Sequence, residues 1–71
     1  MIKALVKDYE VTLENGKKEM VSGDVYVGVW QKDGSFYGAW FTDENGQIQF
    51  AGEVHLTKKE FDEQVESWSE I

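Results

Sequence analysis

Residues 26–54 read YVGVWQKDGSFYGAWFTDENGQIQFAGEV and repeat one motif three times. Each copy has the form aromatic-x-Gly-x-apolar and is centred on Gly28, Gly38 or Gly52. Because strand side chains alternate between two faces, the aromatic residue, the glycine and the last residue of each copy share one face. A glycine inside a strand costs about 0.5–1 kcal/mol relative to alanine, so three such glycines need a structural reason.

Turns of one type separate the expected strands, at Asn15-Gly16, Asp33-Gly34 and Asn45-Gly46. They fit either a two-residue type I′ loop or a three-residue loop whose glycine is left-handed. Three-residue loops put all three motifs on one face, so we predict that Gln31 pairs with Ser35. The same rule pairs Asp43 with Gln47. This register aligns the three glycines, with Tyr26, Trp40 and Phe50 on one side of them and Trp30, Phe36 and Val54 on the other.

The two N-terminal strands are expected to be long and bent. Alternating apolar residues at positions 2–6 and 9–13 are out of phase, which indicates a bend at Lys7-Asp8. A second bend is expected at Ser22-Gly23-Asp24. Two long bent strands followed by two short ones predict a strongly curled, four-stranded antiparallel meander or a small SH3-like partial barrel.

A helix is expected at the C-terminus, over residues 58–70. Thr57 and Glu60 have the spacing of a capping box, and Leu56 with Phe61 forms a hydrophobic staple. Phe61, Val65 and Trp68 then recur as an apolar stripe. We predict that this helix packs on the glycine face and that the glycines allow its close approach. The predicted fold class is mainly β (α+β), in one domain over residues 1–71.

The other sheet face is expected to be apolar on two strands. Val25, Val27 and Val29 lie opposite Phe41, Ala39 and Tyr37 in this register. We expect Ile2, Leu5 or Val11 to cover this face by closing the barrel, because a small chain has few other ways to build a core. If the sheet stays open, the face marks a protein interface or a dimer contact.

The outer face of the predicted helix carries an acidic ridge of Asp62, Glu63, Glu66 and Glu70. Like charges at four-residue spacing repel each other. Lysines in the first turn and glutamates near the end also oppose the helix dipole. A partner that binds the ridge would account for this arrangement, and unselected drift of surface charge is the alternative.

Charge and composition exclude several function classes. The net charge is −7, with seven lysines and no arginine, which disfavours nucleic acids and anionic membranes as partners and favours a basic protein. The absence of cysteine fits a cytoplasmic location, and no leader or membrane segment is recognised in a chain that starts at Met1.

Catalytic and metal-binding patterns are lacking, so we predict no enzyme activity, no cofactor and no metal. The one histidine, His55, would have to activate a serine, and none of Ser22, Ser35, Ser67 and Ser69 follows a nucleophile-elbow pattern. His55 and Glu53 share a strand face, but two ligands fall short of a metal site.

The motif Tyr26-x-Gly28-x-Trp30 resembles the start of a membrane occupation and recognition nexus repeat, and residues 36–40 echo it. The spacings of 10 and 14 residues are irregular and later repeat glycines are missing, so this family is not adopted. A curled sheet with a C-terminal helix also resembles, in topology only, chromodomains and small archaeal chromatin proteins. The latter bind DNA through a basic face, which is opposite in charge to this chain.

We predict a non-enzymatic protein-binding module that docks on a basic protein surface through the acidic ridge, an inhibitor of a nucleic-acid-binding protein being one version. A small acidic chain of this kind also suits a phage or mobile element. The alternative is a small-ligand or carbohydrate binder that uses Tyr37 and Phe41, and a third hypothesis is a homodimer. The candidate partner-binding residues are Asp62, Glu63, Glu66, Glu70, Val27, Tyr37, Ala39 and Phe41.

Overall fold

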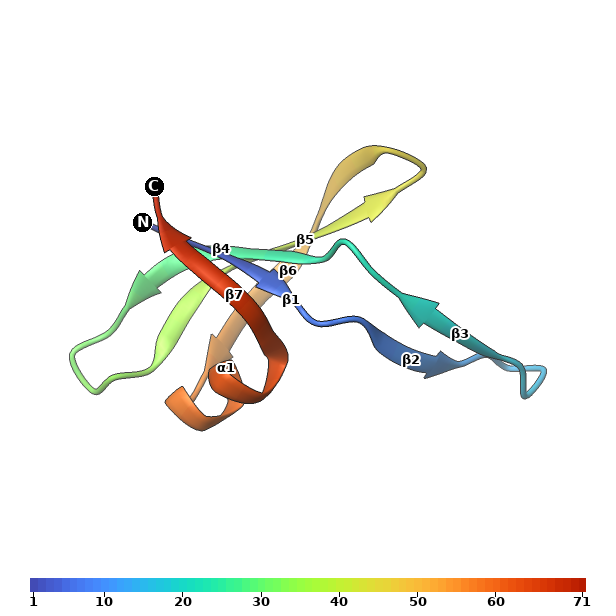
Figure 1. The fold of residues 1–71 in the computed structure, drawn as a ribbon, viewed down its shortest axis with the longest axis horizontal. Helices are drawn as coiled ribbons and strands as arrows, with labels where there is room; N and C mark the ends of the chain where they lie inside the picture. Colours follow the sequence, from blue (N-terminus) through green and yellow to red (C-terminus); the bar gives the residue numbers. More distant parts are fainter.

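The computed structural model describes residues 1–71 as a five-stranded antiparallel sheet, a separate two-stranded hairpin and one short helix (Figure 1). The elements are β1 (Ile2–Val6), β2 (Tyr9–Thr12), β3 (Lys18–Val21), β4 (Val25–Trp30), β5 (Phe36–Glu44), β6 (Gln47–Leu56), α1 (Lys58–Gln64) and β7 (Val65–Glu70). The sheet has the strand order β6-β5-β4-β1-β7. The mainly β, antiparallel prediction with one helix is therefore confirmed. The helix is too short and too polar to cross a membrane.

The β4–β5 hairpin has the predicted register. Gln31 N donates to Ser35 O at 2.7 Å, and Gly34 N donates to Gln31 O at 3.0 Å, which closes a three-residue loop. Gly34 is left-handed, with φ 87°. Gly28 consequently lies opposite Gly38, with Trp30 opposite Phe36 and Tyr26 opposite Trp40.

The β5–β6 register differs from the prediction. Asn45 and Gly46 have φ of 54° and 82°, so the turn is a two-residue loop that pairs Glu44, rather than Asp43, with Gln47. A bulge between Trp40 and Phe41 then shifts the pairing again. The glycines of the three motifs are therefore not aligned, because Gly52 lies opposite Trp40. Phe50 lies opposite Phe41 and not beside Trp40, so its predicted face was wrong.

The C-terminal helix ends at Gln64, six residues before the predicted end at residue 70. Residues 65–70 form β7, which pairs antiparallel with β1 and places Trp68 opposite Ala4. The start is as predicted: Thr57 accepts from Glu60 N, and the Glu60 carboxylate accepts from Thr57 N. Glu66 and Glu70 would have opposed the dipole of a longer helix. As a strand, residues 65–70 instead cover the otherwise free edge of β1, with Glu70 opposite Ile2 and Glu66 at a bulge.

The predicted four-stranded curled barrel is not formed. The bends at residues 7–8 and 22–24 are present, but they detach β2 and β3 as a hairpin arm that projects from the body, while β1 pairs with β4 inside the sheet (Figure 1). A strand held within the sheet cannot fold across its face, so neither Ile2 nor Leu5 covers the second face as expected. Val11 does not cover it either, because it lies on the arm, paired with Glu19. The molecule is elongated, with extents of 42 × 25 × 19 Å.

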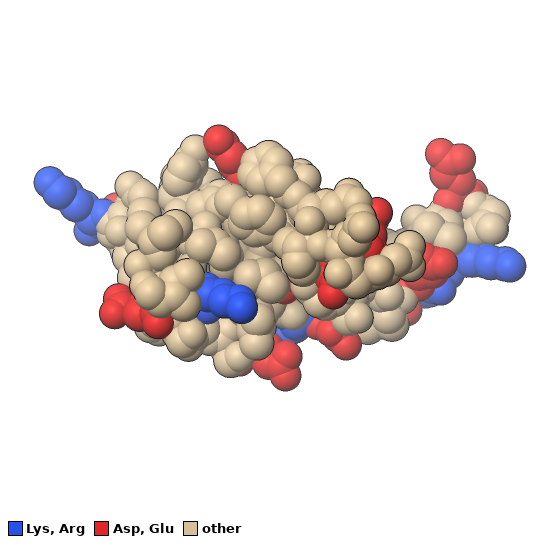
Figure 2. All heavy atoms as spheres, turned by 90° about the horizontal axis from the view of Figure 1, so that it is seen from above, with Lys and Arg blue, Asp and Glu red and all other residues tan.

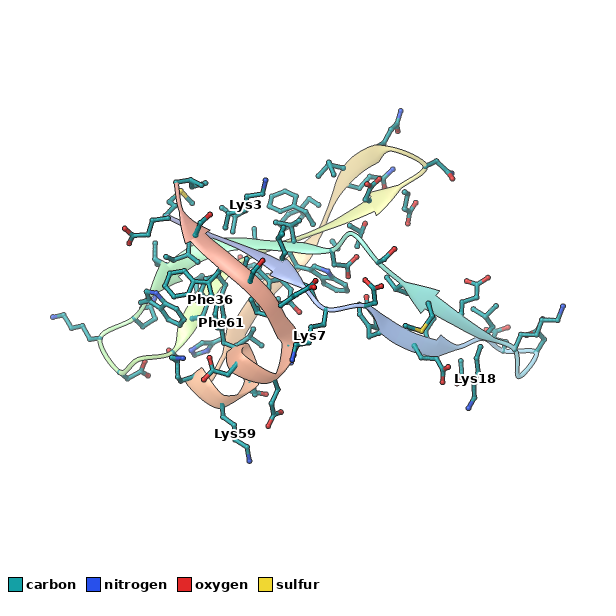
Figure 3. The ribbon with its side chains drawn as sticks, in the orientation of Figure 1. Lys3, Lys7, Lys18, Phe36, Lys59 and Phe61 are labelled. Carbon is teal, nitrogen blue, oxygen red and sulfur yellow. The ribbon has the colours of Figure 1, made fainter.

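The core lies between the sheet and α1, where Phe36 and Phe61 point toward each other (Figure 3). Their ring centroids are 5.1 Å apart, and Trp30 packs edge-on against Phe61 at 4.7 Å. The buried apolar residues are Ile2, Ala4, Val6, Tyr26, Phe36, Leu56, Phe61 and Val65.

The central glycines permit close approach of two strands. A Cβ on Gly28 would lie 2.6 Å from Gly38 Cα, and a Cβ on Gly38 would lie 2.7 Å from Gly28 Cα. The nearest atoms are thus the backbone of the neighbouring strand. The prediction that these glycines allow the helix to approach the sheet is therefore corrected: they allow β4 to approach β5.

Candidate functional site

The face of the sheet opposite α1 is open. We call it the open face and define it by its apolar side chains: Leu5, Val25, Val27, Val29, Tyr37, Ala39, Phe41 and Phe50. Phe50 is 64% exposed, Leu5 45%, Val29 44% and Tyr37 42%. Seen from this side, Figure 2 shows a broad area of uncharged atoms over the body, with most charged side chains at its margins or on the arm. Lys3 lies on this side of the sheet (Figure 3).

Four of the predicted partner-binding residues come together on this open face. Val27 pairs with Ala39, and the neighbouring rungs of the same two strands bring Tyr37 and Phe41 to either side of it. Phe41 also packs edge-on against Phe50, with ring centroids 5.9 Å apart. The exposed Phe50 was missed as a site residue because the bulge that turns it to this face has no clear signal in the sequence.

The predicted acidic ridge is divided between two elements. Asp62 and Glu63 lie on α1, whereas Glu66 and Glu70 lie on β7. Asp62 accepts from Lys58 Nζ at 2.6 Å, so part of its charge is compensated. The four carboxylates therefore do not form one line along a helix, and the ridge is corrected to two separate pairs. Glutamates near a helix C-terminus are unfavourable, so Glu66 and Glu70 could have indicated that the helix ends before them.

A Ser–His contact is present at the end of the β5–β6 pair. Ser35 Oγ lies 3.2 Å from His55 Nε2 and donates to Asp33 Oδ1 at 2.6 Å. Because the hydroxyl's only hydrogen is given to Asp33, His55 can only donate to that oxygen, which is the reverse of a general base. Asp33 also accepts from Ser35 N, and these bonds lower the pKa of Asp33. The bonds between Asp33 and Ser35 thus close the β4–β5 turn, and the His55 contact joins this turn to β6.

A groove of about 600 Å³ lies on the helix side of the sheet, where α1 stops short of covering it. We call it the Trp40 groove. Its residues come from β1, the start of the arm, β4, β5, β6 and the end of α1: Val6, Lys7, Asp8, Tyr9, Tyr26, Trp40, Glu53, Val54, Leu56, Glu63 and Gln64. Tyr26 Oη donates to Gln64 Oε1 at 2.9 Å, which joins β4 to the helix end.

Asp24 is hydrogen-bonded to two residues that line this groove, Tyr9 and Trp40, and is 3% exposed. Its Oδ2 accepts from Tyr9 Oη at 2.7 Å and from Trp40 Nε1 at 3.0 Å, while Oδ1 is buried without a partner. Burial and the hydrogen bond to Asp24 raise the pKa of Tyr9 to about 12. Burial, with a smaller contribution from Asp24, also raises the pKa of Tyr26. From the sequence, Asp24 was expected only to take part in the bend at residues 22–24, and its burial was not predicted.

No three histidine, aspartate or glutamate side chains gather as metal ligands. Comparison of the chain with protein-family models, with curated proteins and with solved structures finds no match. The function must therefore be argued from the open face and the Trp40 groove.

Proposed function

We propose that this chain is a non-enzymatic protein-binding module that docks on a basic protein through its open face. The observation that carries the proposal is the uncovered apolar surface of β4 and β5. Both are inner strands of the sheet, so this surface does not lie at an edge. Contiguous exposed apolar surface of this kind in a water-soluble fold is typical of an interaction site.

The chemistry of the partner follows from charge. The chain carries a net charge of −7, and in Figure 2 charged side chains lie mostly at the margins of the open face. Two charged residues lie on the face itself, Lys3 opposite Val27 and Glu53 opposite Ala39. An apolar face on an acidic chain is complementary to an apolar patch bordered by lysine or arginine, and the net negative charge steers such a partner toward the chain. Two copies of this chain would repel each other, so a basic protein is favoured over a homodimer.

Tyr37 and Phe41, the aromatic residues predicted to stack on a small ligand, already contact other residues of the sheet. Tyr37 Oη donates to Glu53 Oε2 at 2.9 Å, and the Tyr37 ring packs edge-on against His55. Neither the Trp40 groove nor the smaller hollow between β1 and β7 is lined by Tyr37 or Phe41. A flat surface of paired side chains suits a protein better than a small molecule.

The proposal is tested by capture from the source lysate with three baits: the wild-type chain, Val29→Glu on the open face, and Leu13→Glu on the arm. Both variants add one carboxylate at an exposed apolar position, and circular dichroism checks their folding. We expect Val29→Glu to lose the partners retained by the wild type and Leu13→Glu. Equal capture by all three baits would remove the open face as the contact. Sedimentation of the wild type as a dimer would assign the face to self-association.

A further inference from the structure

The Trp40 groove lies on the side of the sheet opposite the open face, so a partner on the open face leaves the groove free. Its volume of about 600 Å³ leaves room for a long side chain together with part of the segment that presents it, and α1 is too short to fill it. The groove combines aromatic and aliphatic walls with polar groups at its rim, which is the composition of a side-chain or ligand pocket.

We propose that the Trp40 groove binds a lysine or arginine side chain presented by a basic protein segment. Three of its lining residues are aromatic, namely Tyr9, Tyr26 and Trp40. Aromatic rings attract ammonium and guanidinium groups, and the aliphatic stems of these side chains pack on surfaces such as Val54 and Leu56.

The Asp24 carboxylate supplies the charge that selects a cation. It is held against the polar ends of Tyr9 and Trp40 by the two hydrogen bonds to Oδ2, and no lysine pairs with it. A buried carboxylate with one unpartnered oxygen leaves its negative field uncompensated within the protein. The raised pKa values of Tyr9 and Tyr26 have Asp24 among their causes, because this field opposes a second negative charge at those hydroxyls.

The rim adds to this selection. Three carboxylate residues line the groove, Asp8, Glu53 and Glu63, of which Glu53 already accepts from Tyr37 Oη, and Lys7 is the one cationic residue there. Lys7 N also donates to Gln64 O at 2.8 Å, which fixes the start of the arm against the end of α1. An uncharged apolar segment would leave the acidic groups desolvated without a partner, so a basic side chain is the better occupant.

The test follows the indole N–H signal of Trp40 in the ¹⁵N-labelled full chain by NMR. The probes are blocked tripeptides with a central arginine, lysine or citrulline, the last being a neutral analogue of arginine. We expect a saturable shift of the Trp40 signal with arginine or lysine at millimolar concentration, little change at the Trp30 and Trp68 indoles, and no shift with citrulline. No Trp40 shift with either cation, or an equal shift with citrulline, overturns the proposal.

Two pairs of matched variants locate the charge. Asp24→Asn should weaken binding about tenfold, while Asp62→Asn, which changes the net charge equally on exposed α1, should leave it within about twofold. Lys7→Gln should tighten binding about two- to threefold relative to Lys3→Gln on the other side of the sheet. If Asp24→Asn does not fold, the comparison of Lys7→Gln with Lys3→Gln still tests the proposal. Equal peptide affinities of these two variants would overturn it. Val29→Glu leaves peptide binding unchanged, so this result is separable from docking at the open face.

Discussion

Ala4 lies directly opposite Trp68 across the β1–β7 pair. Ala4 has no exposed surface, and the Trp68 indole packs edge-on against Trp30, with ring centroids 5.7 Å apart. Trp68 also meets the Phe61 ring at 6.3 Å. The small side chain on β1 thus leaves room for a large one on β7, and the last strand is joined to the aromatic core between sheet and helix.

Replacing Trp68 should therefore destabilise the whole sheet. We expect Trp68→Ala to lower the free energy of unfolding by about 2 kcal/mol, less than for a fully buried tryptophan because the residue is 49% exposed. Trp68→Phe keeps an aromatic contact and should cost less than half as much. Urea unfolding measures both values. A loss below about 0.5 kcal/mol for Trp68→Ala would contradict the assigned packing of β7.

The paired glycines should not tolerate a methyl group. We expect Gly38→Ala to cost at least about 2 kcal/mol, because its Cβ would meet the β4 backbone and the two strands would have to separate. Gly46→Ala is the control, since its Cβ has open space and only the left-handed φ of 82° is unfavourable. That substitution should cost about 1 kcal/mol. Equal costs in urea unfolding would show that sterics across the strand pair are unimportant.

Local signals predicted most of the elements. The Asp33-Gly34 turn and the alternation around it gave the correct β4–β5 register, and the Thr57–Glu60 capping box gave the correct helix start. Both depend on residues close in sequence, for which turn chemistry and capping are strong local preferences.

The errors arise where a distant strand competes with a local preference. The spacing of Phe61, Val65 and Trp68 fits a helix, and residues 65–70 show no strand alternation because Val65 and Trp68 are three residues apart. Pairing with the free edge of β1 makes them a strand, with a bulge at Glu66 that the sequence does not signal. The Asn45-Gly46 turn suits both loop lengths, so its register depends on the bulge beside Trp40. The Asp24 environment could not be predicted, because Tyr9 and Trp40 reach it from other elements.

The capping box at the start of α1 should contribute measurably in so short a helix. Thr57→Ala removes the acceptor for Glu60 N and should lower the free energy of unfolding by about 1 kcal/mol. Thr57→Ser keeps the hydroxyl and should retain most of the stability. Guanidinium unfolding of the three chains provides the comparison, and equal stability of Thr57→Ala and the wild type would contradict a structural role for the cap.

Alkaline pH should destabilise the fold through its tyrosines. All three have raised pKa values: Tyr9 to about 12 by burial and its bond to Asp24, Tyr26 by burial and the Asp24 charge, and Tyr37 chiefly by its hydrogen bond to Glu53. In the unfolded chain they lose their protons near pH 10. Between about pH 10 and 12 the unfolded chain therefore binds fewer protons than the folded chain, so the free energy of unfolding falls as pH rises. Below pH 9 these groups are protonated in both states and contribute no pH dependence.

Tyr9→Phe separates the Tyr9 contribution from the others. This variant keeps the ring but removes the hydroxyl that donates to Asp24, so we expect a smaller fall in stability between about pH 10 and 12 than in the wild type. Urea unfolding across this range gives the slope, and tyrosinate absorbance of the folded chain gives the titration itself. The wild-type chain should complete that titration well above the ordinary tyrosine pKa of 10.0, and Tyr9 should be the last to ionise. Complete ionisation of all three tyrosines near pH 10 with the fold intact would contradict the position of Tyr9 against the buried carboxylate.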